Sequence, residues 1–125
     1  NNTDETSTLL TAMQQDKITR LLEVADIHFI VGRIVDPPGS NAYDAYKQVL
    51  NIDPNDKQAE AGLLVISDHY ESLALDSLDN GDIKNAVKFI STGLQVTPNH
   101  PGLAVLNKRI LGPTLTAQRT NYRNT

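Results

Sequence analysis

The sequence predicts an all-α fold, and three observations support this prediction. Aliphatic residues recur at steps of three and four over most of the chain, which is typical of helices that bury one side. Aromatic residues make up only 5% of the sequence, so Leu, Ile, Val and Ala must fill the core, which suits packed helices better than a β-sandwich. The third observation is an internal repeat, because a shift of about 44 residues places Ala42 on Ala86 and Pro54 on Pro98 without a gap.

The first predicted helix begins near Asp16 and ends at the turn Asp36-Pro37-Pro38-Gly39, because proline disfavours a helical conformation in the residue before it. Its apolar stripe is wide, so we expect this helix to be covered on more than one side. The stripe comprises Ile18, Leu21, Leu22, Ala25 and Phe29. The polar residues 1–13 before it are predicted to form a linker or a frayed start.

The second predicted helix covers Ala42 to about Asn51, with Ser40 or Asn41 as its N-cap. Its inward residues are Ala42, Tyr46, Val49 and Leu50. The turn Asp53-Pro54-Asn55-Asp56 separates it from a long third helix, which contains no proline between Lys57 and Asp79. At ~1.5 Å per residue the third helix is about 35 Å long. Its inward stripe consists of Ala59, Leu63, Ile66, Tyr70, Leu73 and Ser77.

A Gly81-Asp82 turn opens the fourth predicted helix, which ends before Pro98. Its inward face is predicted to contain Ile83, Val87, Ile90 and Leu94. The segment Asn99-His100-Pro101-Gly102 starts a last helix with proline in its first turn. This helix presents Leu103, Leu106 and Ile110 and ends at Gly112-Pro113. We therefore expect a helical domain over residues 14–111, followed by a flexible polar tail over residues 112–125.

The repeat also aligns Tyr46 with Ile90 and Leu50 with Leu94. A fixed period of this size in helical sequence is typical of stacked helix pairs, since one pair cannot bury its apolar face alone. The repeat therefore predicts two helix pairs that share one core.

The motif Gly81-Asp82, Ala86, Ile90, Leu94 and Pro98 resembles the second helix of a tetratricopeptide repeat, with its turn, small residue, aliphatic residues and closing proline. The resemblance implies stacked antiparallel helix pairs and a C-terminal capping helix after the closing proline. The family repeats about every 34 residues, so the longer spacing here implies first helices that are elongated by about 15 Å.

The composition excludes several classes of function. Eleven basic and fifteen acidic residues give a formal charge of -4 without a basic run, which argues against nucleic acid as a partner. The absence of cysteine excludes disulfides and thiolate chemistry, and it is compatible with both the cytoplasm and a bacterial periplasm. The sequence has no Gly-rich phosphate loop and no serine nucleophile elbow. We therefore predict no enzyme activity, no catalytic residue and no cofactor.

The three imidazoles are His28, His69 and His100. The sequence contains no HExxH motif. Asp26 and His28, or His69 and Glu71, project from different faces of a helix because they are two residues apart. We therefore predict structural histidines and no metal site.

The resemblance also implies a function, because the first helices of tetratricopeptide repeats line a ligand groove. The corresponding residues are Ile27, Val31, Ile34, Asp68, Glu71, Ser72, Leu75 and Leu78. This mixed apolar and acidic set favours a protein partner that offers an apolar helix or a basic extended peptide. The alternative interpretation of its apolar members is that they are packed core.

We therefore expect a non-catalytic protein–protein interaction or scaffold domain of a larger, bacterial-type protein. Two alternatives stay open, a self-association module that forms a homodimer and a spacer in a membrane-anchored protein. No apolar run reaches the roughly 20 residues of a membrane span, so we expect no membrane insertion by this segment.

Overall fold

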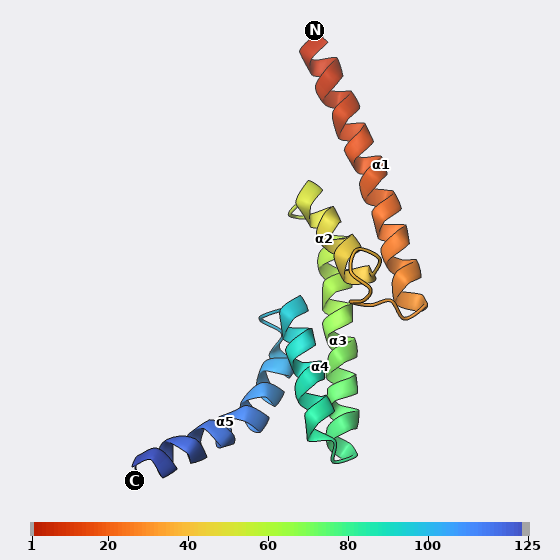
Figure 1. Cartoon of the computed structure of the whole chain (residues 1–125). Coiled ribbons are helices and arrows are strands. Elements are labelled where there is room, and N and C mark those ends of the chain that lie inside the picture. Colours follow the sequence, from red (N-terminus) through yellow and green to blue (C-terminus); the bar gives the residue numbers. More distant parts are fainter. Residues whose placement is uncertain (1, 124–125) are drawn as a thin grey trace. The chain divides into compact units, whose positions relative to one another are not determined.

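The computed structural model describes the backbone of residues 2–123 and the side chains of residues 11–112. These residues form five helices and no strand, which confirms the all-α prediction (Figure 1). The helices are α1 (Asn2–Ile30), α2 (Ala42–Ile52), α3 (Lys57–Asp79), α4 (Ile83–Val96) and α5 (Pro101–Arg123). None of the helices in the described part combines the length and apolar character that a membrane crossing requires.

The chain divides into two compact units, Asn1–Leu63 and Leu64–Thr125. Helix α3 contributes its first turns to the first unit and its remaining turns to the second. The predicted linker 1–13 and tail 112–125 lie mostly outside the residues with described side chains, but their backbone is helical from Asn2 and up to Arg123.

In the first unit, α2 turns back along α1 and packs against it (Figure 1). The buried residues come from all three helices, namely Ile18, Ala25, Ala42, Ala45, Tyr46, Val49 and Ala59. The ring of Tyr46 lies against Gly62 of α3, where any Cβ atom would overlap the ring. The absence of a side chain at this position therefore allows α3 to approach α2 closely.

Helix α1 ends at Ile30, six residues before the predicted stop at Asp36. Gly32 adopts a φ of 86°, and the N–H groups of Gly32 and Arg33 donate to the carbonyls of Phe29 and His28. This is the Schellman arrangement, in which a glycine closes a helix by entering the left-handed region. The prediction of the helix end was wrong because it considered the prolines and not this glycine. The predicted start was also late, because the helix begins at Asn2.

Asn41 is the N-cap of α2, one of the two predicted candidates. Its Oδ1 accepts from the N–H of Asp44 across 2.8 Å, and its Nδ2 donates to the carbonyl of Pro37 across 2.9 Å. Asn41 is only 1% exposed, so the oxygen and the nitrogen of its side-chain amide both need hydrogen-bond partners within the protein. Ser40, the other candidate, is exposed and is not the N-cap.

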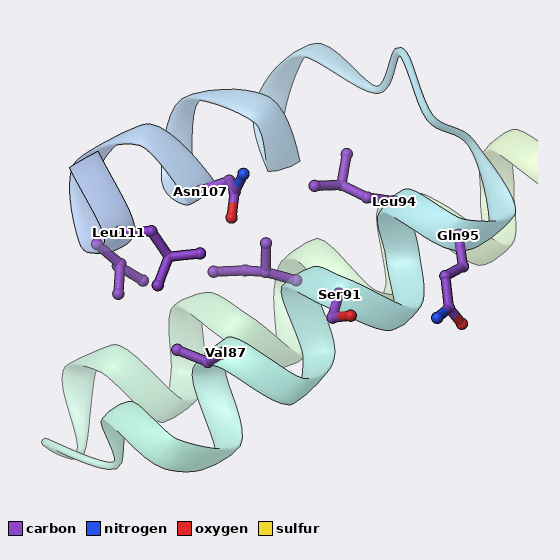
Figure 2. Close-up of a pocket in the computed structure, with 8 residues that line it drawn as sticks. Val87, Ser91, Leu94, Gln95, Asn107 and Leu111 are labelled. Atoms are coloured by element: carbon purple, nitrogen blue, oxygen red, sulfur yellow. The ribbon is translucent and has the colours of Figure 1, made fainter. Parts of the chain in front are cut away.

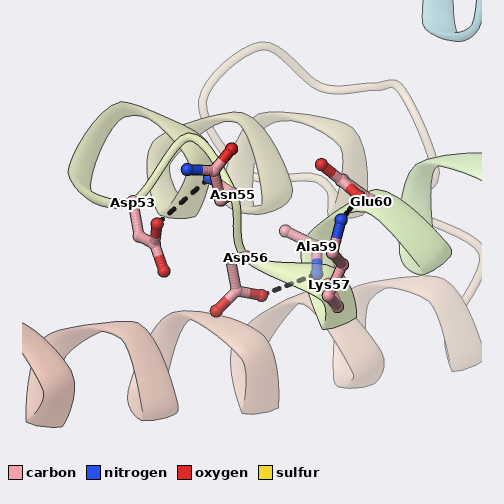
Figure 3. A network of polar contacts seen from close by, with 6 residues as sticks. All are labelled: Asp53, Asn55, Asp56, Lys57, Ala59 and Glu60. Carbon is pink, nitrogen blue, oxygen red and sulfur yellow. Dashed lines mark hydrogen bonds and ion pairs between the residues drawn. The ribbon is translucent and has the colours of Figure 1, made fainter.

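The turn between α2 and α3 is at the predicted residues (Figure 3). Asp53 accepts from the N–H of Asn55 across 3.0 Å, and Asp56 accepts from the N–H of Ala59 across 2.9 Å. Asp53 therefore satisfies a backbone donor within the turn and Asp56 one in the first turn of α3, so both carboxylates have structural roles.

Tyr46 connects α2 to α1, because its hydroxyl donates to Oδ1 of Asp26 across 3.2 Å. Burial of the phenol, followed by the nearby Asp26 charge and this hydrogen bond, raises the pKa of Tyr46 from 10.0 to about 12. A raised pKa means that folding favours the neutral phenol. Its contribution to stability is therefore complete below pH 10 and is lost as the pH rises towards 12.

We expect Tyr46→Phe to lose this alkaline sensitivity. In the wild type the free energy of unfolding should fall by about 2 kcal/mol between pH 10 and 12 because of Tyr46, in addition to losses from other groups. Urea unfolding of both proteins across this range measures the difference. Tyr43→Phe on the same helix is the matched control. Equal pH profiles for wild type and Tyr46→Phe would contradict the assignment.

In the second unit, α3 and α4 run antiparallel, and the chain turns after α4 so that α5 packs against α4 (Figure 1). Ala74, Ile90, Leu103 and Leu106 form the buried cluster. Leu78, Phe89, Leu94 and Ile110 pack against this cluster. Ser67 is also buried, and its hydroxyl donates to the carbonyl of Gly93 across 3.0 Å, which connects α3 to α4.

Two predictions for the second unit need correction. Ile83 was assigned to the inward face of α4 but is 51% exposed, because it is the first residue of the helix and lies before the part that packs. Helix α5 continues through Gly112-Pro113 to Arg123 instead of ending there. Proline removes one helical hydrogen bond, but its φ of about −65° is compatible with a helix. The predicted bounds of α3, and the Gly81-Asp82 start of α4, are confirmed.

The residues that the repeat aligns in α2 and α4 have matching burial. Ala42 and Ala86 are both 0% exposed, and Tyr46 and Ile90 are both buried. The preceding helices, α1 and α3, differ more. Under the 44-residue shift, the end of α1 at Ile30 falls on a position inside α3. The pattern of the second helices is thus better preserved than that of the first.

Candidate functional site

The residues of the predicted groove come from both units. In the first unit, Ile27 and Val31 are 56% and 55% exposed. Ile34 is half-buried in the loop after α1, and its carbonyl accepts from the N–H of Tyr43 across 2.9 Å. Ile27 and Val31 are therefore available to a partner, whereas Ile34 positions the start of α2.

Helix α1 presents large apolar side chains on the side opposite its buried residues Ile18 and Ala25. Met13, Val24 and Ile27 are 61%, 42% and 56% exposed. Together with Lys17, Arg20 and Val31 they follow steps of three and four, and we call this set the α1 outer stripe. The wide apolar pattern of the sequence predicted a helix that is covered on more than one side. In the described structure the outer side of α1 is exposed.

In the second unit the predicted groove residues divide into two groups. Ser72 and Leu75 are exposed on α3, whereas Leu78 packs against the buried cluster. The carboxylates of Asp68 and Glu71 lie at the start of α5, where Glu71 is half-buried and Asp68 stays exposed. The acidic part of the predicted groove is therefore used in contacts within this unit.

His100 lies at the centre of these contacts and is 3% exposed. Its Nδ1 accepts from the N–H of Leu103 across 3.1 Å and so caps the first turn of α5. Its Nε2 lies 2.6 Å from Oδ1 of Asp68. Because Nδ1 accepts a hydrogen bond, the ring proton belongs on Nε2, which donates it to Asp68. The ring is thus held in one tautomer by α3 and α5.

Glu71 lies beside this histidine, with its carboxylate against Gly102 in the first turn of α5. A Cβ atom at Gly102 would overlap the carboxylate in this position, so a larger residue there would displace the end of the Glu71 side chain. The N-terminal turn of a helix has free N–H groups and a partial positive charge, which favours an anionic side chain there.

Asp68, Glu71 and His100 each offer one ligand atom, and these atoms lie within 4.8 Å of one another. The sequence interpretation did not identify this group, because it paired histidines with carboxylates nearby in the chain. Within the described residues, Nδ1 of His28 instead accepts from Nε of Arg33 across 2.9 Å, and His69 lies edge-on to Tyr70. Only the packing of α5 on α3 brings His100 to Asp68.

A pocket of about 410 Å³ lies between α4 and α5 (Figure 2). Its lining contains no charged side chain and consists of Val87, Ile90, Ser91, Leu94, Gln95, Asn107, Ile110 and Leu111. Such a lining offers apolar contact and two amides, but no group that titrates near neutral pH for acid–base chemistry. The pocket therefore presents a mainly apolar surface.

Comparison of the chain with protein-family models, with curated proteins and with solved structures gave no match. The resemblance to tetratricopeptide repeats therefore depends on the sequence pattern alone.

Proposed function

We propose that this chain is a non-catalytic protein-interaction domain that binds an amphipathic helix of a partner protein along the α1 outer stripe. The observation that carries this proposal is the exposure of Met13, Val24 and Ile27 on one side of a helix whose other side is already packed, with the exposed Val31 directly after the helix end. Apolar side chains that are aligned on one surface mark interaction sites, whereas scattered ones do not.

A helix is the partner that fits this spacing best. Residues at alternating steps of three and four form a line along a helix, and a second helix packs its own apolar residues against such a line. Lys17 and Arg20 interrupt the line, so the partner should present carboxylates at that level. The exposed ion pair of Arg20 with Asp16, at 3.3 Å, contributes at most about 1 kcal/mol and can be exchanged for a partner's carboxylate.

The rigidity of the scaffold supports the same function. Helix α1 is held by α2 and closed by Gly32, so binding does not require this surface to become ordered. In tetratricopeptide-like scaffolds, stacked helices present preformed surfaces in the same way.

The test uses the double variant Val24→Asp/Ile27→Asp, with Ile83→Asp as the matched control because Ile83 is also an exposed isoleucine. Both proteins should keep the wild-type circular dichroism spectrum and Tm. Proteins that bind wild type and control, but not the double variant, are captured from the source cells and identified by quantitative mass spectrometry. The binding segment of one such protein is then purified, and its Kd is measured by calorimetry.

We expect the partner segment to be helical and its affinity to fall at least about tenfold in the double variant, since two buried aliphatic contacts are lost. Equal affinity of wild type and double variant for every captured protein would refute the proposal. Light scattering tests the self-association alternative. A dimer that dissociates in the double variant would assign the stripe to a second copy of this chain.

A further inference from the structure

We propose that Asp68, Glu71 and His100 form a binding site for one divalent transition-metal ion of the Zn²⁺ class. One imidazole nitrogen and two carboxylate oxygens are ligands that Zn²⁺ accepts, and here they converge within 4.8 Å. They come from two turns of α3 and from the residue before α5, so a metal ion would join these two helices.

The charge of the cluster favours a cation. Among the described side chains, lysine and arginine form the ion pairs Arg20–Asp16 and Lys57–Glu60, so none of the described ones neutralises Asp68 or Glu71. The imidazole itself is neutral in this arrangement, because Nδ1 accepts the Leu103 N–H and Nε2 carries the ring proton. Two carboxylates thus face one neutral ring, and the partial positive charge at the start of α5 offsets only part of their charge.

The three ligands differ in how firmly they are held. His100 is 3% exposed and is fixed by contacts at both ring nitrogens. Glu71 is half-buried against Gly102. The Asp68 side chain is 58% exposed, so it can move by the small distance that coordination requires. The exposed side of the cluster leaves room for water molecules to complete the coordination.

Metal binding should change which ring nitrogen of His100 carries the proton, and this change can be measured. The ion takes the lone pair of Nε2, so the Nε2 proton leaves and a neutral metal-bound ring carries its proton on Nδ1. The Leu103 N–H then loses its acceptor, which means that the metal ion and the α5 cap compete for the ring. The net proton count of the imidazole is unchanged, because one nitrogen loses a proton and the other gains one.

The experiment is a calorimetric titration of the full chain with ZnCl₂, together with the ligand variants His100→Asn, Glu71→Gln and Asp68→Asn. His100→Asn is informative because asparagine is a strong N-cap, so α5 stays capped while the Nε2 ligand is removed. Asp68→Asn keeps an oxygen that accepts a hydrogen bond but removes the charge. The matched controls are His69→Asn and His28→Asn, whose imidazoles lie outside the cluster.

We expect a 1:1 complex, at least tenfold weaker binding in each ligand variant, and unchanged binding in the two controls. In nitrogen-resolved NMR spectra, Zn²⁺ should move the ring proton of His100 from Nε2 to Nδ1 and shift the Leu103 amide. Binding that survives His100→Asn, or that is lost in a control variant, would overturn the proposal, as would the absence of 1:1 binding at micromolar Zn²⁺. Because the α1 outer stripe plays no part in this measurement, its outcome is independent of the proposed interaction function.

Discussion

Replacing Leu103 with alanine is expected to lower the free energy of unfolding by about 2–5 kcal/mol. Leu103 is 0% exposed and belongs to the cluster that joins α3, α4 and α5. Truncation removes its apolar contacts and leaves a cavity that three helices border, so the surroundings cannot close it without moving a helix. Urea unfolding followed by far-ultraviolet circular dichroism measures the loss.

Val105→Ala is the control for this substitution, because Val105 is on the same helix and is 50% exposed. Its effect should lie within about 0.5 kcal/mol of the wild type. If both variants lose a similar amount of unfolding free energy, the substitutions weaken α5 itself. The burial of Leu103 would then not explain the loss of stability.

Gly93→Val is expected to destabilise the protein by about 2–3 kcal/mol through overpacking. Gly93 is buried in α4, where a Cβ atom would overlap Cδ1 of Leu103 and lie 3.1 Å from Cβ of Tyr70. A glycine in the middle of a helix normally lowers its stability, so the close approach of α3 and α5 explains why glycine stands here. The measurement is again urea unfolding, with Ser91→Val on the exposed side of α4 as the control.

The two substitutions should couple, because Gly93 and Leu103 are in contact. In the double variant Gly93→Val/Leu103→Ala, the valine can occupy part of the space that leucine vacates. We therefore expect the combined loss to be smaller than the sum of the single losses by about 0.5–3 kcal/mol. Strictly additive losses would contradict the proposed contact.

Helix boundaries could be predicted from the sequence where a residue type allows only a few backbone conformations. Gly81 and Asp82 marked the boundary between α3 and α4, and the structure gives Gly81 a φ of 75° and makes Asp82 the N-cap. Gly32 carries the same signal at the end of α1, whereas Pro37 and Pro38 suggest a later helix end. The end of α1 could therefore have been predicted from the position of Gly32.

The groove residues illustrate what local patterns cannot decide. Ile27 of α1 and Leu78 of α3 are both apolar residues of the predicted groove. Ile27 is nevertheless 56% exposed, whereas Leu78 packs against the buried cluster. Periodicity identifies that a side of a helix is apolar, but the neighbouring helices decide whether that side is covered. Periodicity likewise does not reveal that Asp68 contacts His100 and that Glu71 lies against Gly102 at the start of α5.

The sequence by itself determined the helical class, the bounds of α3 and the Gly81-Asp82 start of α4, and it narrowed the N-cap of α2 to two residues, because helical periodicity, capping and glycine turns act between neighbours in the chain. The tertiary structure decided the cluster at Asp68, Glu71 and His100, the exposure of the α1 outer stripe and the need for glycine at position 93. These features depend on contacts between residues far apart in the sequence. His100 and Asp68 are separated by 32 positions and meet only because the first turn of α5 packs against α3.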